Sequence, residues 1–187
     1  MTVVTLRDGT AVRIRDLEPG DRQRLADGFA RLSPTARLMR FGHEVTELTP
    51  SMLDALMDVD GHDHVALVAI DDADPDGPGL GIARFIREPF DTYAAEAAVT
   101  VAQDQRGRGI GTALLAALAA RAVREGVTEL RNYVLVENVT MRKVFEDLGA
   151  RTSLEGATVL RIDLPTSGPL RSDSDAARVF RNIAAVE

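Results

Sequence analysis

The residues of this sequence best suited to chemistry form a glycine-rich segment from Arg106 to Thr112. The segment reads Arg-Gly-Arg-Gly-Ile-Gly-Thr; an apolar stretch of strand type (residues 99–101) precedes it, and an alanine- and leucine-rich run (residues 113–123) follows. The first turn of a helix leaves backbone N–H groups unpaired at the positive end of the helix dipole. Glycines let such a backbone approach a phosphate closely. The order strand, glycine loop, helix therefore indicates a pyrophosphate site, with a plain strand-to-helix turn as the alternative.

Two common phosphate-binding loops do not fit this segment. A Walker loop requires a lysine directly before Thr112, and the sequence has Gly111 there. The dinucleotide fingerprint G-x-G-x-x-G requires a third glycine where Thr112 or Leu114 stands. The spacing that fits is Arg-x-x-Gly-x-Gly, at Arg106, Gly109 and Gly111. This spacing resembles the acyl-CoA pyrophosphate loop of the GNAT superfamily of N-acetyltransferases.

The resemblance extends well beyond the glycine-rich segment. Residues 95–101 resemble the fourth strand of that superfamily, and residues 136–141 and 148–150 resemble its fifth strand and fourth helix. Five N-terminal segments are similar to the Pat-type bacterial protein lysine acetyltransferases: residues 7–10, 13–15, 32–34, 40–41 and 65–69. Together these motifs span roughly residues 7 to 150.

The resemblance implies acetyl-CoA as acyl donor, bound without a metal. Backbone groups of Val99 and Val101 would pair with the pantetheine arm as a neighbouring strand does. The backbone amides of residues 107–112 would hold the pyrophosphate, and Asn138 would contact the cofactor arm while also capping a helix. The cofactor-binding residues implied are Val99, Val101, Arg106, Gly107, Arg108, Gly109, Ile110, Gly111, Thr112 and Asn138.

The resemblance also implies a catalytic base. The acceptor amine arrives protonated, with a pKa of about 10.4 if it is a lysine, and must lose a proton before it attacks the thioester. Glu96 is the candidate, because the family commonly has a glutamate on this strand. Its apolar neighbours lead us to expect a desolvated carboxylate. An outward-facing glutamate in an alternating strand is the alternative.

One position departs from the family pattern. Many GNAT enzymes carry a tyrosine seven residues after the asparagine, where it acts as general acid for the departing thiolate. Here Phe145 stands at that place. A thiol with an ordinary pKa of about 8.5 leaves without such help, and Pat-type sequences also tend to lack the tyrosine.

The composition excludes several other classes of function. The chain has 22 basic and 29 acidic residues and a net charge of −7, which argues against a nucleic-acid partner. Cysteine is absent, so disulfides, thiolate zinc sites and a cysteine nucleophile are excluded. The three histidines are His43, His62 and His64. We expect them to be solvated or core residues; a two-ligand metal site at the last two is the weaker alternative.

Charge is unevenly distributed along the chain. Residues 44–83 contain ten Asp and Glu residues and no Lys or Arg, whereas arginines gather around the glycine-rich segment. A basic half for a phosphorylated cofactor and an acidic half for a cationic acceptor would suit an amine acyltransferase. Two ordinary solvated surfaces are the alternative.

Hydrophobic periodicity and breaker residues predict the elements that position these groups. We expect strands near residues 2–6, 10–17, 64–70, 80–86, 94–102, 130–136 and 157–164. Helices are predicted from Pro19 to Arg31, from Ser33 with Leu38 and Phe41 facing inward, from Thr49, after the glycine segment to about residue 125, and over residues 138–148. The predicted fold is α/β (α+β), with a mixed, largely antiparallel sheet flanked by helices on both faces.

We expect one acyltransferase domain over residues 1–164 and a C-terminal tail over residues 165–187. A short amphipathic helix over residues 175–184 would either pack against the domain or make an oligomer contact. The chain starts without the pattern of a signal peptide and has no apolar run of about 18 residues, so we expect a cytoplasmic protein without a membrane partner. Monomer and homodimer both remain open.

The predicted function is acetyl-CoA-dependent N-acetylation by direct attack of an amine. The acceptor implied by the Pat resemblance is a protein lysine, on a partner such as an acyl-CoA synthetase. One alternative is a small-molecule amine acetyltransferase for polyamines or aminoglycoside-like amines. A weakly catalytic acyl-CoA-sensing module is the alternative from another class.

Overall fold

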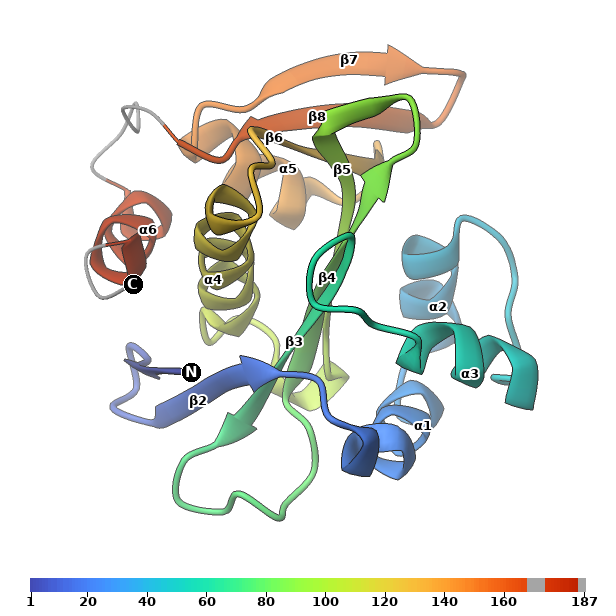
Figure 1. Cartoon of the computed structure of the whole chain (residues 1–187), viewed down its shortest axis with the longest axis vertical. Helices are drawn as coiled ribbons and strands as arrows, with labels where there is room; N and C mark the ends of the chain where they lie inside the picture. The colour runs from blue at the N-terminus through green and yellow to red at the C-terminus, as the bar shows by residue number, and fades with distance from the viewer. Residues whose placement is uncertain (168–173, 185–187) are drawn as a thin grey trace.

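The computed structural model describes residues 1–167 and 174–184, and within them the chain forms an eight-stranded sheet with helices on both faces (Figure 1). The strands lie in the order β1-β2-β3-β4-β5-β6-β8-β7. Neighbouring strands are antiparallel except β5 and β6, which run parallel. The predicted mixed, largely antiparallel sheet is confirmed. The strands are β1 (Thr2–Thr5), β2 (Ala11–Asp16), β3 (His64–Asp71), β4 (Gly81–Glu88), β5 (Asp91–Val101), β6 (Glu129–Leu135), β7 (Arg151–Glu155) and β8 (Val159–Pro165).

The helices form two separate layers (Figure 1). One face of the sheet carries α1 (Arg22–Ala30), α2 (Pro34–Phe41) and α3 (Pro50–Met57). The other carries α4 (Ile110–Arg124), α5 (Val139–Asp147) and α6 (Asp175–Ala184). The main core lies between the sheet and α4, whose alanines and leucines are buried on most sides of the helix. A smaller core of Phe29, Leu32, Ala36 and Val45 holds α1 and α2 together.

Local sequence explains where α2 and α3 begin. The hydroxyl oxygens of Ser33 and Thr49 accept hydrogen bonds from the backbone N–H groups of Ala36 and Met52, each at 3.2 Å. A proline occupies the first helical position in both cases. Such caps satisfy backbone donors that have no partner within the helix. The predicted starts of these helices are confirmed.

Two local predictions need correction, and one strand was missed. The helix expected from Pro19 begins as a short 3₁₀ turn (Pro19–Asp21) and becomes α-helical at Arg22. Leu38 was expected to face inward, but it is 41% exposed, because only the Phe41 side of α2 meets the Phe29 ring. Strand β7 was not predicted. All five of its residues are exposed, so no apolar alternation marks it in the sequence.

The C-terminal helix packs against the domain. Ala176, Ala177 and Ile183 of α6 are buried, and Val179 and Phe180 pack against the main core next to α4. Residues 168–173 and 185–187 of the predicted tail lie outside the described residues. Among the residues that are described, none of the helices combines the length and the hydropathy needed to cross a bilayer.

Candidate active site

Strands β5 and β6 pair only over a short stretch at their beginning. The pairing ends at Glu96 and Arg131, although β5 continues to Val101 and β6 to Leu135. On its other side β6 pairs with β8 along its whole length. The second half of β5 therefore has an edge to which β6 is not hydrogen-bonded. Such an edge can accept an extended chain as an additional strand.

The backbone groups at this edge include those of Val99 and Val101. The backbone N–H of Ala102 donates to Leu80 O at 2.9 Å, on the β4 side of the strand. Successive residues of a strand direct their backbone groups to opposite sides. The N–H and C=O groups of Val99 and Val101 therefore point toward the opening, while their side chains pack against the core beneath α4.

The glycine-rich segment forms the connection from β5 to α4. Gly107 and Gly109 adopt φ values of 77° and 96°, in the region that favours glycine. Gly109 is the N-cap of α4, and no side chain caps this helix. The bond from Ala113 N to Gly109 O, at 3.0 Å, is the first of the helix. The amides of residues 110–112 therefore lack acceptors within the helix and are available to an anion.

Gly111 allows the start of α4 to approach β5 closely. A Cβ atom at this position would lie 3.3 Å from Cγ2 of Val101 and 3.9 Å from Cγ1 of Val99. The neighbouring Ile110 is buried in the main core and fixes the first turn, while Thr112 is half-buried. The free amides of the helix and the open edge of β5 are therefore held next to each other. This arrangement fits a ligand with both a pyrophosphate and an extended amide-bearing arm, as acetyl-CoA has.

The two arginines of the segment differ in their surroundings. Arg108 donates to Asp8 Oδ2 and to Thr10 Oγ1, each at 2.7 Å, and to the side chain of Gln105. The hydrogen bond from Arg108, together with those from Thr10, lowers the pKa of Asp8 to about 2. Arg108 thus ties the segment to the β1–β2 hairpin. Arg106 is exposed, and among residues 1–167 and 174–184 no hydrogen bond or ion pair engages its side chain.

Asn138 follows β6 and stands at the start of α5, and Phe145 lies within α5. Asn138 is the N-cap of α5, and its Oδ1 accepts a hydrogen bond from Met141 N at 3.3 Å. The predicted capping role is confirmed. Phe145 is 1% exposed and belongs to the main core. The position that carries a tyrosine in many GNAT enzymes is therefore filled here by a packing residue.

Glu96 stands at the last paired position of β5, directly before the strands separate. The expected desolvation of its carboxylate is wrong, because the side chain is exposed. Its partner across the β4–β5 ladder, Ile86, is 51% exposed, so this part of the sheet is not covered. Alternation along β5 places Glu96 on the same face as Thr100, which faces the α1–α3 layer. Glu96 can therefore meet an acceptor that approaches from that side.

Two arginines near Glu96 were not identified from the sequence. Arg84, on β4, is 5% exposed, and Arg40, on α2, is half-buried. Burial lowers the pKa of Arg40, and the negative charge of Glu96 opposes this shift. A charged residue within the apolar run of β4 was the available signal for Arg84. No comparable signal marks Arg40, which lies on an ordinary amphipathic helix.

A cavity of about 80 Å³ lies between the α1–α3 layer and strands β3 to β5. Four charged residues are among those that line it, namely Arg40, Arg84, Asp21 and Arg24. Its walls are mostly apolar, with Phe29 and other side chains from α1, α2 and the sheet. The space is large enough for a few water molecules or one small group.

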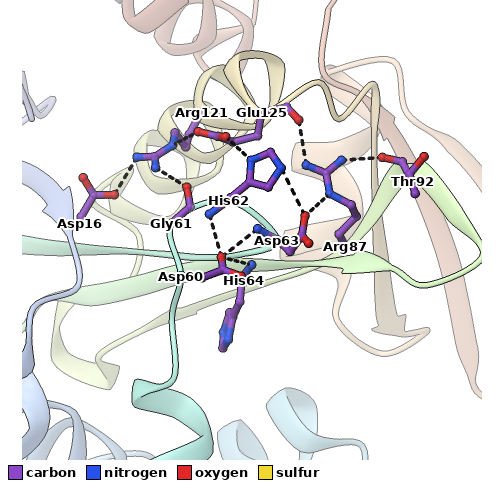
Figure 2. Close-up of polar contacts among 10 residues, drawn as sticks. All are labelled: Asp16, Asp60, Gly61, His62, Asp63, His64, Arg87, Thr92, Arg121 and Glu125. Atoms are coloured by element: carbon purple, nitrogen blue, oxygen red, sulfur yellow. Dashed lines mark hydrogen bonds and ion pairs between the residues drawn. The ribbon is translucent and has the colours of Figure 1, made fainter.

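A polar network fixes the chain that enters β3. Figure 2 shows three successive backbone N–H groups, those of His62, Asp63 and His64, converging on Asp60 Oδ1 at 2.8 to 2.9 Å. His62 Nδ1 lies 2.7 Å from Glu125 Oε2 at the end of α4. The His64 ring points away from this cluster, toward the other face of the sheet (Figure 2). There its Nε2 lies 3.1 Å from Nη1 of Arg84.

The acidic stretch over residues 44–83 does not form a single acidic face. Three of its carboxylates pair with arginines from outside the stretch, namely Asp54 with Arg22, Asp63 with Arg87 and Asp72 with Arg13. The acidic loop after β3 lies beside α1, where Arg24 donates to the carbonyl oxygens of Pro75 and Gly77. The charges are therefore divided between two parts of the molecule and partly neutralised. Among the described residues no group of three or more His, Asp and Glu side chains is placed to hold a metal ion.

Comparisons with known proteins agree with this geometry. The GNAT acetyltransferase family model matches residues 33–150. The chain is 36% identical over 164 residues to acetyltransferase Pat of Mycolicibacterium smegmatis, covering 87% of this chain and 48% of that protein. It is 35% identical over 147 residues to acetyltransferase PA5475 of Pseudomonas aeruginosa, covering 79% of this chain and 78% of that protein. The chain thus spans about half the length of Pat.

Solved structures show the same fold. The GNAT domain of S. lividans PAT superposes with a TM-score of 0.80 at 27% identity, over 88% of this chain and 96% of that domain. The family match covers both the open edge of β5 and the glycine-rich start of α4. The chain belongs to the GNAT family of acetyltransferases.

Proposed function

We propose that the protein transfers the acetyl group of acetyl-CoA to a lysine side chain of a protein, with Glu96 as general base. The observation that carries the proposal is the place of Glu96. Its exposed carboxylate stands where β5 and β6 separate, on the face opposite α4. The donor enters through the opening between the strands, and the acceptor approaches Glu96 from the side of α1–α3.

The donor is held mainly by backbone groups. The amides of residues 110–112 and the left-handed turn at Gly107 and Gly109 bind the pyrophosphate, and Arg106 adds a positive charge beside it. Val99 and Val101 pair with the pantetheine arm along the open edge of β5. Asn138 contacts the same arm from the β6 side. The thioester then lies near Glu96, where the opening begins.

The chemistry needs one proton acceptor and an ordered pair of reactants. Glu96 takes a proton from the ammonium, directly or through a water molecule. The free amine nitrogen then attacks the thioester carbonyl carbon, a C–N bond forms and the C–S bond breaks. The nitrogen loses a second proton as the amide forms, and this proton neutralises the charge of the departing thiolate. Phe145 has no hydroxyl group to donate, so the thiolate leaves without an acid from this position.

A protein lysine is favoured as acceptor by the similarity to Pat and to the PAT domain, and by the open surroundings of Glu96. An acyl-CoA synthetase is a candidate partner through the same Pat-type resemblance. A small-molecule amine is the second candidate. It is supported by the cavity under α1–α3, which has room for one small group of such an amine.

The test compares both acceptor classes in one experiment. Radiolabelled acetyl-CoA is incubated with the protein and either a cell lysate or a panel of polyamines and aminoglycosides. We expect a labelled protein band and slow turnover of the small amines. Efficient turnover of one small amine without a labelled protein band would contradict the lysine assignment. Saturable acetyl-CoA binding without any turnover would favour a sensing module.

A further inference from the structure

Arg84 is a buried cation in the middle of the sheet. Its side chain lies opposite Ala98 on β5, between Thr100 and Glu96, and only 5% of the residue is exposed. The Nη1 group donates to Leu56 O at 3.1 Å, at the end of α3, and to Nε2 of His64. Burial and the nearby charge of Arg40 lower the pKa of Arg84 to about 10. Both effects disfavour the charged guanidinium of Arg84, because burial removes water from it and Arg40 repels it.

Arg40 brings a second positive charge to the same cavity. Its guanidinium carbon lies 4.9 Å from the centre of the Phe41 ring, a cation–π distance. Within the part of the chain that the structure describes, no hydrogen bond or ion pair reaches the Arg40 guanidinium. Its N–H groups are therefore free to bind a group that enters the cavity.

Neither guanidinium has a carboxylate within ion-pair distance among the described residues. Asp21 lines the same cavity and is 2% exposed, but it is already bound. Arg15 donates to both of its oxygens, at 2.6 and 2.9 Å, and Arg24 also pairs with it. The negative charge of Glu96 partly offsets that of Arg40 from a distance. Two partly desolvated like charges without a carboxylate in contact are still unfavourable, and an anion between them would reduce this cost.

We infer that Arg84 and Arg40 form a carboxylate-binding subsite for the acceptor, so that the acetylated amine belongs to a group with a carboxylate close by. The inference rests on Glu96 as the base of the proposed function. Glu96 is the diagonal neighbour of Arg84 across the β4–β5 ladder. Residues in such diagonal positions lie about 7–8 Å apart, with their Cβ atoms somewhat closer. A molecule with its amine at Glu96 and its carboxylate at the arginines fits this spacing.

His64 is a positioning residue for this subsite. Burial and then the charge of Arg84 lower the pKa of His64, so the ring is neutral at neutral pH and accepts the hydrogen bond from Arg84. Three backbone bonds to Asp60 fix the chain from which the ring extends (Figure 2). Both of these hydrogen bonds use Nη1 of Arg84, and among the described residues no hydrogen bond engages its Nε or Nη2. Arg84 also lines the cavity, so these two groups are the ones available to a carboxylate.

The carboxylate can belong to an acidic residue next to the acetylated lysine, or it can be the carboxylate of a free amino acid. Two pairs of acceptors distinguish these sources. One pair consists of lysine peptides that differ only in Asp or Asn next to the lysine. The other consists of free lysine and cadaverine, which lacks the carboxylate. We expect kcat/KM to favour the carboxylate-bearing member of at least one pair by about 10-fold, as a charge-assisted hydrogen bond would give. The pair that shows the preference identifies the source.

Variants connect this preference to the two arginines. In Arg40→Gln and Arg84→Gln the preference should disappear, whereas Arg22→Gln should keep it. Arg22 is a suitable control, because it lies on α1 with 44% of its side chain exposed and pairs with Asp54 on the surface. A buried arginine can be needed for folding, but Arg40→Gln breaks no hydrogen bond of the described structure. Equal kcat/KM within both pairs, or a preference that survives in Arg40→Gln, would overturn the inference.

A binding measurement tests the subsite without turnover. Sodium glutarate, compared with sodium chloride at equal ionic strength, should raise the Tm of the wild type and not that of Arg40→Gln. If no acceptor is acetylated at all, the proposed function fails and this measurement alone decides the subsite. No glutarate effect on the wild type, or stabilisation by inorganic phosphate alone, would contradict a carboxylate site.

Discussion

The two faces of the sheet present their reactive groups in different ways. On the α4 face, the candidate donor site consists of backbone: free amides at an uncapped helix start and an open strand edge. On the α1–α3 face, the candidate acceptor site consists of side chains from separate elements, namely Glu96, Arg40 and Arg84. The backbone site suits a constant ligand, whereas side chains can select among acceptors. We therefore expect substitutions on the α4 face to change the binding of the donor, and substitutions on the α1–α3 face to change catalysis and the choice of acceptor.

The largest expected effect is on catalysis. Glu96→Gln should lower kcat by about 10²–10⁴ at neutral pH, because the ammonium loses its proton acceptor. Its Kd for acetyl-CoA should stay near the wild-type value, since the donor is bound by backbone groups. Steady-state kinetics and calorimetry measure the two quantities. Glu155→Gln, on the exposed strand β7, is the matched control and should change neither. A joint loss of affinity and rate in Glu96→Gln would remove the proposed division between the faces.

The next largest effect is on donor binding. Gly109→Asp should weaken acetyl-CoA binding by about 100-fold or more, because an aspartate adds a like charge and strains a residue with φ 96°. Gly126→Asp is the control at the other end of α4, where φ is 75° and the space is also open. It should bind acetyl-CoA normally. Calorimetry on folded Gly109→Asp with unchanged affinity would refute the loop assignment.

Asp21 tests how the α1–α3 layer is held in place. Asp21→Asn should lower the free energy of unfolding by about 3 kcal/mol, because it leaves Arg15 and Arg24 without their carboxylate. Asp54→Asn, an exposed pair with Arg22, should cost less than about 1 kcal/mol. Urea denaturation measures both values. Equal effects would show that the buried ion cluster has no special role.

The Asp21 cluster also predicts a dependence on pH. Burial alone would raise the pKa of Asp21, but hydrogen bonds from Arg15 and from the Glu18 N–H outweigh it and hold the pKa at about 2, below its ordinary 3.8. The unfolded chain then binds this proton more readily. The stabilisation is therefore complete above about pH 3.8 and is lost as the pH falls toward 2. The Asp21→Asn variant should lack this component of acid unfolding.

The smallest expected effect comes from His64. Because its pKa is lowered by burial and by Arg84, the unfolded state takes up a proton at higher pH than the folded state. Stability should therefore fall as the pH drops below the ordinary value of 6.5. Thermal unfolding of His64→Gln should show a smaller drop over this range. His43→Gln, an exposed histidine bonded to Phe41 O, is the control and should follow the wild type.

The difference between the faces also explains what the sequence predicted. The glycine spacing, the apolar strand before it and the helix after it are local, so the candidate donor site could be located from residues 99–112 alone. Arg40 and Arg84 meet only because α2 packs on the sheet, where it contacts β5, and no spacing in the sequence relates them. Strand β7 was missed because its side chains are all exposed. The exposure of Glu96 depends on how much of the sheet the α1–α3 layer covers. The alternation of apolar residues along β5 carries no information about that coverage.

The most direct test of Glu96 as a base is the pH dependence of kcat/KM, measured for the wild type and Glu96→Gln from pH 6 to 10 with one lysine acceptor. The fraction of free amine rises about tenfold per pH unit below its pKa of about 10.4. The ratio of wild-type to variant activity should therefore be largest near neutral pH and should decrease steadily as the pH rises. A ratio that stays constant over this range would contradict the account, because Glu96 would then orient the acceptor without removing its proton.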